Sequence, residues 1–281
     1  MHKEVAAFTK WISPTPIEHE IRELTVSIIS RAISLAFPDA KVMPFGSYET
    51  KLYLPSGFAY TVVFTLFHTE LPLSDIDLVI LSDSMAYSNK VSVLHSLAAV
   101  LRKAGITSNV TVIAKAKVPI VKFVTTHGRF NVDISLNQVN GIISGQVVKG
   151  FLQSMGGDGI ALRSLVFIIK LFLCQRSMNE VFTGGLGSYS IVCLAISFLQ
   201  MHPKIRRGEI IPEKNLGVLV MEFFELYGCH FNYDEVGISI RDGGTYFSKH
   251  GWHDLAKWSC LSIEDPVNPS MYKPLGLVDT C

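Results

Sequence analysis

A short segment in the first third of the chain alternates carboxylate and apolar side chains. It reads Ser74-Asp75-Ile76-Asp77-Leu78-Val79-Ile80. Successive side chains of a β-strand point to opposite faces, so this pattern predicts a strand with Asp75 and Asp77 on one face. The other face is then apolar and consists of Ile76, Leu78 and Ile80. We therefore expect a strand that buries one face and presents two carboxylates on the other.

A second segment, further along the chain, repeats this pattern. It reads Phe130-Asn131-Val132-Asp133-Ile134-Ser135-Leu136 and puts Asp133 on the polar face. Carboxylates on neighbouring strands, each backed by an apolar face, form a set of hard oxygen ligands suited to Mg²⁺. Two such ions can activate an attacking oxygen and stabilise a leaving phosphate. An Asp-x-Asp pair alone is more often only the polar face of an amphipathic strand.

The upstream tripeptide Phe45-Gly46-Ser47 favours the metal site over that simpler interpretation. A Gly-Ser turn at the start of a helix offers N–H groups to a triphosphate. Together with Asp75, Asp77 and Asp133, the turn resembles the active-site pattern of nucleotidyltransferases of the DNA polymerase β type.

The composition is that of a globular protein with a large core. Of the 281 residues, 48% are hydrophobic and 17% are charged, which argues against disorder. The net charge of +1 neither indicates nor excludes nucleic-acid binding. The five cysteines form no Cys-x-x-Cys pair, which argues against a zinc site and a disulfide framework. No uninterrupted apolar run is long enough to predict a transmembrane helix.

The hydrophobic pattern changes near Asn140-Gly141 and predicts two domains. Residues 38–140 are expected to be α+β, a mixed sheet with helices, with strands near 41–45, 75–82, 110–117, 119–125 and 130–136 and a helix over 89–104. Residues 141–281 are expected to be mostly helical, with helices near 145–155, 159–176, 187–202 and 214–227 and a hairpin over 236–248. An N-terminal helix over 15–37 carries the apolar stripe Ile17, Ile21, Leu24 and Ile28 and is expected to pack on the helical domain.

Four further residues are candidates for nucleotide binding, and three of them also have a structural interpretation. Lys170 lies in an otherwise apolar helix, where it either extends its ammonium group to solvent or binds a triphosphate. Ser188 is either a helix N-cap or a phosphate ligand, and Tyr189 is positioned to stack on a base. Asn137 either reaches a ribose hydroxyl or serves the turn after its strand. The lysines near the predicted strands are interpreted as solvated charges: Lys115, Lys117 and Lys122.

Several longer motifs accompany the Gly-Ser and Asp segments. They are Leu52-Tyr53-Leu54-Pro55, Val118-Pro119-Ile120-Val121-Lys122, Asn179-Glu180-Val181-Phe182-Thr183-Gly184-Gly185 and Glu222-Phe223-Phe224-Glu225-Leu226-Tyr227-Gly228. Together these motifs closely resemble the TRAMP-type poly(A) polymerases, which are terminal nucleotidyltransferases of the DNA polymerase β superfamily. The resemblance covers most of residues 13–268.

The resemblance implies a nucleotidyltransferase catalytic domain and a helical central domain that closes the nucleotide cleft. It implies that Asp75, Asp77 and Asp133 are catalytic and hold Mg²⁺ or Mn²⁺. It further implies that ATP is bound by Ser47 of the Gly46-Ser47 turn, Gly141, Lys170, Ser188 and Tyr189, with Tyr189 under the adenine. The implied reaction is template-independent addition of AMP from ATP to RNA 3′ ends in RNA surveillance, decay or processing.

The resemblance also implies partners and a location. RNA 3′ ends are the implied substrate, and a zinc-knuckle RNA-binding protein and an RNA helicase are the implied protein partners. The implied compartment is the nucleus, with the cytoplasm as an alternative, and no membrane is involved.

The chain departs from the pattern of that family in two places. Residues 57–73 form an apolar insertion between the Gly-Ser turn and the first Asp pair, which we interpret as a retained intron or a gene-model error. After Ile263-Glu264-Asp265-Pro266 the expected base-reading Asn and Arg and the closing helix are missing, so we expect a truncated C-terminus. Two alternatives therefore remain: a catalytically impaired isoform acting as a binding scaffold, and a terminal uridylyltransferase.

Overall fold

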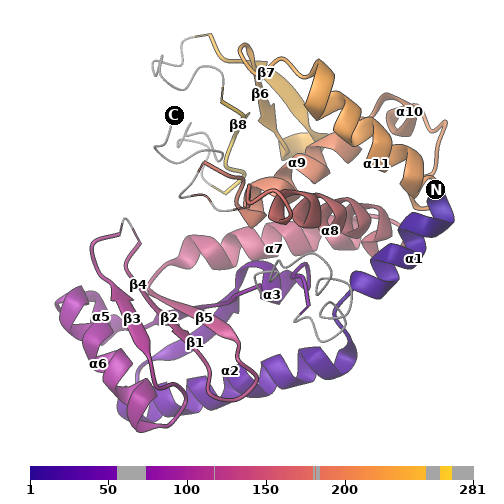
Figure 1. Ribbon diagram of the computed structural model, residues 1–281. Coiled ribbons are helices and arrows are strands. Elements are labelled where there is room, and N and C mark those ends of the chain that lie inside the picture. The colour runs from indigo at the N-terminus through magenta and orange to yellow at the C-terminus, as the bar shows by residue number, and fades with distance from the viewer. Residues whose placement is uncertain (56–73, 117, 180, 182–183, 251–259, 268–281) are drawn as a thin grey trace. The chain divides into compact units, whose positions relative to one another are not determined.

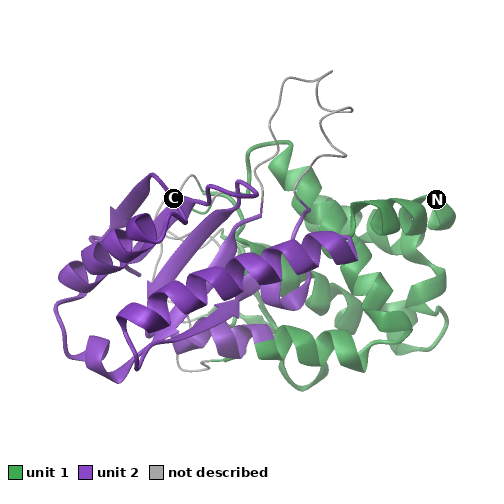
Figure 2. Cartoon of the chain, turned by 90° about the horizontal axis from the view of Figure 1, so that it is seen from below, with its two compact units in different colours: residues 1–13, 146–281 green, residues 14–145 purple. Residues whose placement is uncertain are grey.

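The computed structural model describes residues 1–55, 74–116, 118–179, 181, 184–250 and 260–267. The chain forms two compact units (Figure 2). Residues 14–145 make up the sheet unit, and residues 1–13 with 146–281 make up the helical unit. The division falls inside helix α7, Val139–Ser154, a few residues after the predicted change of pattern. The predicted insertion at 57–73 lies outside the described residues.

The sheet unit is built on a five-stranded mixed sheet with the order β1-β2-β5-β4-β3. The strands are β1 Lys41–Phe45, β2 Ile76–Leu81, β3 Val110–Ile113, β4 Ile120–Val124 and β5 Asn131–Leu136. Strands β2 and β5 are parallel, and the other neighbouring pairs are antiparallel. The helices of this unit are α2 Pro16–Ala36, α3 Gly46–Thr50, α5 Asp83–Ala86 and α6 Lys90–Lys103. This arrangement confirms the predicted α+β class.

One face of the sheet is apolar and packs against helices α2 and α6 (Figure 1). The alternation predicted for β2 and β5 is present in the structure. The fully buried residues of these two strands include Ile76, Leu78 and Ile80 of β2 and Val132 and Ile134 of β5. They share one core cluster with Ile29 and Ile33 of α2 and Leu94 and Leu97 of α6. Because the strand Asp residues alternate with these apolar residues, Asp77 and Asp133 lie on the opposite face of the sheet.

Helix α2 begins as predicted but buries a different face. The side-chain oxygen of Thr15 accepts a hydrogen bond from the Glu18 N–H at 3.2 Å, which caps the helix. The predicted apolar stripe is exposed to between 46% and 68%: Ile17, Ile21, Leu24 and Ile28. The buried side chains are Arg22, Ile29 and Ile33, and the helix packs on α6 and β1.

This packing corrects the expectation that helix 15–37 joins the helical domain. The helix belongs to the sheet unit, where Ile29 and Ile33 pack into the core cluster and Arg22 shares their buried face. A guanidinium group that is fully removed from water requires hydrogen-bond partners, and Arg22 has them on the side of the sheet. Hydrophobic periodicity alone therefore selected the wrong face of α2.

The helical unit contains α1 His2–Ile12, which the sequence pattern did not predict, and most of α7. Its other helices are α8 Ile160–Cys174, α9 Ser188–Met201, α10 Pro203–Arg206 and α11 Leu216–Glu225. Helix α8 packs against α1, α9 and α11. Short helical turns lie at Gly157–Gly159, Pro212–Lys214, Leu226–His230 and Arg241–Gly243. A small sheet has the order β7-β6-β8, with strands β6 Val236–Ser239, β7 Thr245–Ser248 and β8 Ser262–Ile263. Strands β6 and β7 are the predicted hairpin.

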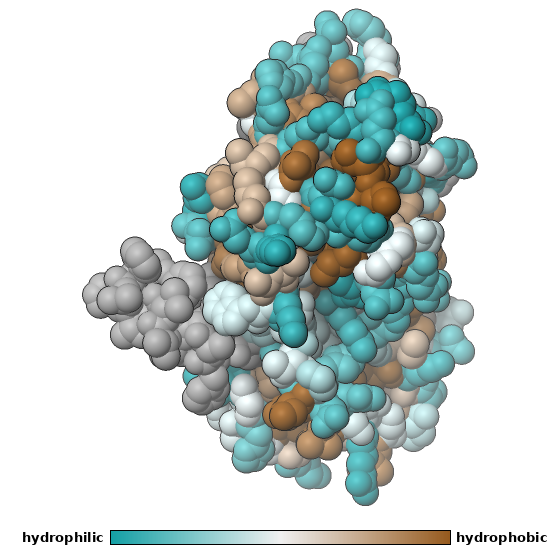
Figure 3. Space-filling view, turned by 90° about the vertical axis from the view of Figure 1, so that its right-hand side faces the viewer, coloured by the Kyte–Doolittle hydropathy of each residue, from teal (hydrophilic) through white to brown (hydrophobic). Residues whose placement is uncertain are grey.

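Exposed apolar side chains are scattered over the surface. Val218 and Met221 of α11, for example, are 44% and 58% exposed. In the face shown in Figure 3, hydrophobic residues stand in small groups between hydrophilic ones. Such exposure is usual for protein surfaces, so we infer no binding surface from it. None of the helices in the described part of the chain has the length and hydropathy required to cross a bilayer.

Candidate active site

The register of the sheet brings the predicted carboxylates together. Asp77 of β2 is directly opposite Asp133 of β5, and Asp75 immediately precedes β2. Directly opposed residues of neighbouring strands project from the same face, and Asp75 shares that face with Asp77. The side chains of Asp75 and Asp133 are 30% and 20% exposed. The three carboxylates are therefore neighbours, partly shielded and still open to solvent.

Lys122 of β4 joins this group. It is directly opposite Asp133 in the antiparallel β4–β5 pair. Its Nζ donates hydrogen bonds to Asp75 Oδ2 at 3.0 Å and to Asp133 Oδ2 at 3.3 Å. Burial lowers the pKa of Lys122, but the hydrogen bonds and the charges of the two carboxylates raise it more, so the net shift is upward. The interpretation of Lys122 as a solvated charge is therefore corrected: it is the cation between two carboxylates.

The sequence held a signal that would have found Lys122. Strands β4 and β5 were both predicted, and the short segment between them contains His127-Gly128, a typical turn sequence. In a hairpin the turn fixes which residues oppose each other, and counting outward from this turn pairs Val124 with Asn131 and Lys122 with Asp133. Lys117, interpreted in the same way as Lys122, lies outside the described residues.

Arg22 anchors the backbone next to the carboxylates and was missed by the sequence analysis. Its side chain is fully buried, and its Nη1 donates to the carbonyl oxygen of Ser74 at 3.1 Å. The guanidinium carbon lies 4.4 Å from the centre of the Tyr53 ring and 4.9 Å from that of Phe130. The Ser74 hydroxyl also accepts from the Leu54 N–H at 2.9 Å. These contacts hold the segment that leads into Asp75, and cation–π packing makes a buried guanidinium tolerable.

The Gly-Ser turn lies beside Asp77. Gly46 has a φ of +67° and follows Phe45, which is directly opposite Asp77 in the sheet. A Cβ at position 46 would collide with the Asp77 carboxylate and would lie 3.2 Å from its Cγ. Only glycine therefore allows the backbone to approach this carboxylate so closely. Ser47 follows in the first turn of α3 and is partly exposed.

Asn137 and Gly141 have structural roles in the sheet unit. Asn137 accepts a hydrogen bond from the Ser82 N–H through Oδ1 and donates to the Ser82 carbonyl through Nδ2, both at 3.0 Å. This geometry favours the alternative in which Asn137 serves the turn. A Cβ on Gly141 would lie 2.6 Å from the Phe45 ring, so this glycine lets α7 approach β1.

Lys170, Ser188 and Tyr189 belong to the helical unit. Lys170 is buried within α8. Ser188 is the exposed first residue of α9, whose N-cap is Gly187, so the alternative in which Ser188 is the cap is wrong. Tyr189 is the partly buried second residue of α9; burial raises the pKa of the Cys193 thiol to about 12, and the Tyr189 side chain opposes that rise.

Comparisons with known proteins connect this geometry to a family. Residues 65–153 match the central palm domain of mitochondrial-like poly(A) RNA polymerases, and residues 215–271 match the Cid1 family of poly A polymerases. Poly(A) RNA polymerase CID14 of Cryptococcus neoformans is 50% identical over 266 residues, which cover 94% of this chain and 32% of that protein. Poly(A) RNA polymerase cid14 of Schizosaccharomyces pombe is 45% identical over 269 residues, which cover 95% of this chain and 36% of that protein.

A solved structure gives the same result. The polymerase core of TRAMP, an RNA surveillance complex, is 40% identical with a TM-score of 0.81, covering 98% of this chain and 80% of that chain. This chain belongs to the poly(A) RNA polymerase family. The Cid1 poly(U) polymerase, at 20% identity and a TM-score of 0.74, shares the fold of this family member. The chain spans about a third of the length of the two curated poly(A) RNA polymerases.

The carboxylates of this poly(A) RNA polymerase family member fit a divalent cation. Among the described residues no three His, Cys, Asp or Glu side chains form a ready-made cluster. Lys122 instead occupies the space between Asp75 and Asp133 and takes oxygens that a metal ion would use. The donor set of carboxylates is nevertheless the one that Mg²⁺ prefers, and a positive charge already stands among them. The ammonium group is thus a stand-in for the charge of a cation.

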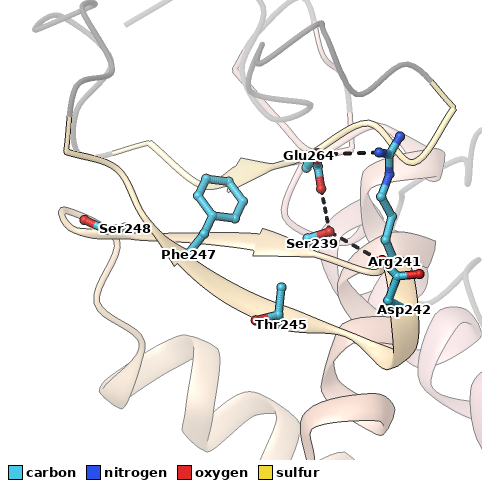
Figure 4. A pocket seen from close by; sticks show the side chains of 7 residues that line it. All are labelled: Ser239, Arg241, Asp242, Thr245, Phe247, Ser248 and Glu264. Carbon is cyan, nitrogen blue, oxygen red and sulfur yellow. Dashed lines mark hydrogen bonds and ion pairs between the residues drawn. The ribbon is translucent and has the colours of Figure 1, made fainter.

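A separate hollow of about 520 Å³ lies beside the small sheet of the helical unit (Figure 4). Arg241 Nη2 donates to the carbonyl oxygens of Asp265 at 3.3 Å and Pro266 at 2.9 Å. The Ser239 hydroxyl donates to the Glu264 carboxylate at 2.5 Å. These bonds tie residues 264–266 to strand β6 and to the helical turn that follows it, so we assign them to the stability of the helical unit.

Proposed function

We propose that this chain catalyses template-independent addition of AMP from ATP to RNA 3′ ends. The observation that carries the proposal is the direct pairing of Asp77 with Asp133, with Asp75 beside them, in a member of the poly(A) RNA polymerase family. In this reaction the RNA 3′-oxygen forms a bond to the α-phosphorus of ATP, its proton passes to solvent, and pyrophosphate leaves with the bonding electron pair.

In this proposal Asp75, Asp77 and Asp133 hold Mg²⁺ or Mn²⁺. When bound, such ions lower the pKa of the 3′-hydroxyl and stabilise the charge on the departing pyrophosphate. The protein contributes position more than covalent chemistry. The sheet register fixes Asp77 against Asp133, Arg22 fixes the backbone before Asp75, and Gly46 leaves room beside Asp77.

The nucleotide-binding residues belong to the same proposal. The Gly46-Ser47 turn would receive the triphosphate, as would Lys170 and Ser188 of the helical unit, and Tyr189 would stack on the adenine. The proposed setting is nuclear RNA surveillance with a zinc-knuckle RNA-binding protein and an RNA helicase as partners. Its support is that the 40% identical solved structure is the polymerase core of an RNA surveillance complex.

Extension of a labelled oligo(A) RNA, with Mg²⁺ and each nucleoside triphosphate in turn, tests this function. We expect ladders of extended RNA with ATP. The rate of extension should fall at least about 1,000-fold in the Asp75→Ala/Asp77→Ala double variant and should not change in the matched control Asp83→Ala. Asp83 is an exposed carboxylate of α5 outside the site. Ladders with UTP alone would mean that the reaction is uridylyl transfer and not adenylyl transfer. No extension by well-folded protein, with or without a zinc-knuckle partner, would indicate a binding scaffold instead.

A further inference from the structure

Lys122 occupies an unusual position for a strand lysine. Its ammonium group lies between the carboxylates of Asp75 and Asp133, at 3.0 and 3.3 Å. The two carboxylates come from segments that are far apart in the sequence, so the lysine bridges β4 to both β5 and the residue before β2. The lysine side chain is 45% exposed, and it can therefore leave its partners without disrupting the core.

The oxygens that Lys122 contacts are the ones proposed to hold metal ions. Oδ2 of Asp75 and Oδ2 of Asp133 each accept one hydrogen bond from the ammonium group. A divalent cation that binds these carboxylates needs the same lone pairs and brings a second positive charge to the same place. The ammonium group and the divalent cation therefore cannot both make their full contacts with these two carboxylate oxygens.

We propose that Lys122 is an internal counter-cation that competes with the divalent cation for Asp75 and Asp133 and is displaced from at least one of them when the cation binds. This inference rests on the proposed function, since it requires that these carboxylates bind the cation. In the absence of the cation, the ammonium group offsets the repulsion between the carboxylates and keeps them in place. Lys122 therefore lowers the affinity of these carboxylates for the cation.

Titration of Mn²⁺ into the full chain, followed by the electron paramagnetic resonance of free Mn²⁺ in low-salt buffer, tests the competition. Loss of two partly exposed ion pairs predicts that Lys122→Met binds Mn²⁺ on the order of fivefold more tightly than the unaltered chain. Lys122→Arg keeps the charge and should bind no more tightly than the unaltered chain. The difference should shrink as salt is added, because salt screens the charge of Lys122.

Two controls separate this inference from the proposed function. Lys115→Met removes an exposed lysine that contacts neither Asp75 nor Asp133 in the described part of the chain, and it should leave Mn²⁺ affinity unchanged. Asp75→Ala/Asp77→Ala should abolish binding. If that double variant loses binding but Lys122→Met binds equally or less tightly, the competition is refuted and the metal site stands. If the double variant binds as well as the unaltered chain, or none of the variants binds Mn²⁺, the metal site and the competition both fail.

Discussion

The two ends of strand β2 carry the same kinds of side chain but hold them in different ways. At its start, Asp75 and Asp77 stand beside Asp133 with the Lys122 ammonium between them. At its end, Ser82 donates its hydroxyl proton to Asp39 at 2.7 Å and has its backbone N–H and carbonyl bonded to the Asn137 amide. The first end is held by the ammonium group of an exposed lysine, and the second by hydrogen bonds that backbone groups and a hydroxyl make with the Asn137 amide and the Asp39 carboxylate.

The difference indicates which end is available for chemistry. A lysine that is 45% exposed can rotate away from its carboxylates, so the start of β2 can exchange partners while the fold stays intact. The backbone of Ser82 cannot leave Asn137 without opening the turn after β5. Asp, Asn and Ser residues near a sheet edge therefore do not by themselves mark a site. The partners that they contact, and whether those partners can move, decide between the two roles.

The largest effect on stability should come from substitution of Arg22, the buried side chain that holds the segment before β2. Arg22→Ala removes a fully buried guanidinium from between the Tyr53 and Phe130 rings and leaves the Ser74 carbonyl without that donor. We expect the free energy of unfolding in urea to fall by about 3 kcal/mol. The exposed Arg31→Ala on the same helix should change it by no more than about 0.5 kcal/mol. Equal stability of the two variants would show that Arg22 does not hold this end of the strand.

The turn at the other end of β2 should be the next most sensitive position. Asn137→Ala deprives the Ser82 N–H and carbonyl of their partners and places alanine at a φ of +51°, so we expect a loss of about 2 kcal/mol. Asn137→Gly keeps the backbone conformation and should lose less. The exposed Asn140→Ala in α7 is the matched control.

This variant also decides the role that the sequence left open for Asn137. If the residue serves the turn, the KM for ATP of the folded Asn137→Gly variant should equal that of the unaltered chain. A raised KM with unchanged stability would instead assign Asn137 to the ribose, and the contrast between the two ends of β2 would weaken.

Much of the carboxylate end could be predicted from sequence because strand periodicity is local. The alternation in 74–80 and 130–136 correctly predicted two strands with buried apolar faces, and the apposition of Asp77 with Asp133 agrees with it. Position relative to the rest of the fold is not local. The stripe of α2 from Ile17 to Ile28 was assigned to a core that the helix does not enter. The helix instead buries Arg22, Ile29 and Ile33 in the sheet unit.

Lys122 illustrates the same limit on a smaller scale. A strand lysine is usually solvated, and composition alone gives no reason to think otherwise. Its role follows only from register, because Asp133 comes from the next strand of the hairpin and Asp75 from the far side of that strand. The residue types of a site can be predicted from the sequence. The position of Lys122 between the carboxylates can be predicted only once the pairing of the strands is known.

The smallest effect should appear at Asp39, the anion at the end of β2. The hydrogen bonds donated by Ser82 Oγ and Ser84 N–H lower the pKa of Asp39 from 3.8 to about 2. A carboxyl group whose pKa is lower in the folded than in the unfolded state adds stability above pH 3.8 and loses that contribution as the pH falls through about 2. Asp39→Ala should therefore be less stable than the unaltered chain at neutral pH, and the difference should vanish towards pH 2. Urea unfolding at several pH values measures it, with the exposed Asp234→Ala as a control. A difference in stability that persists below pH 2 would mean that Asp39 acts through packing and not as an anion. The end of β2 at Ser82 would then be held without a charged group.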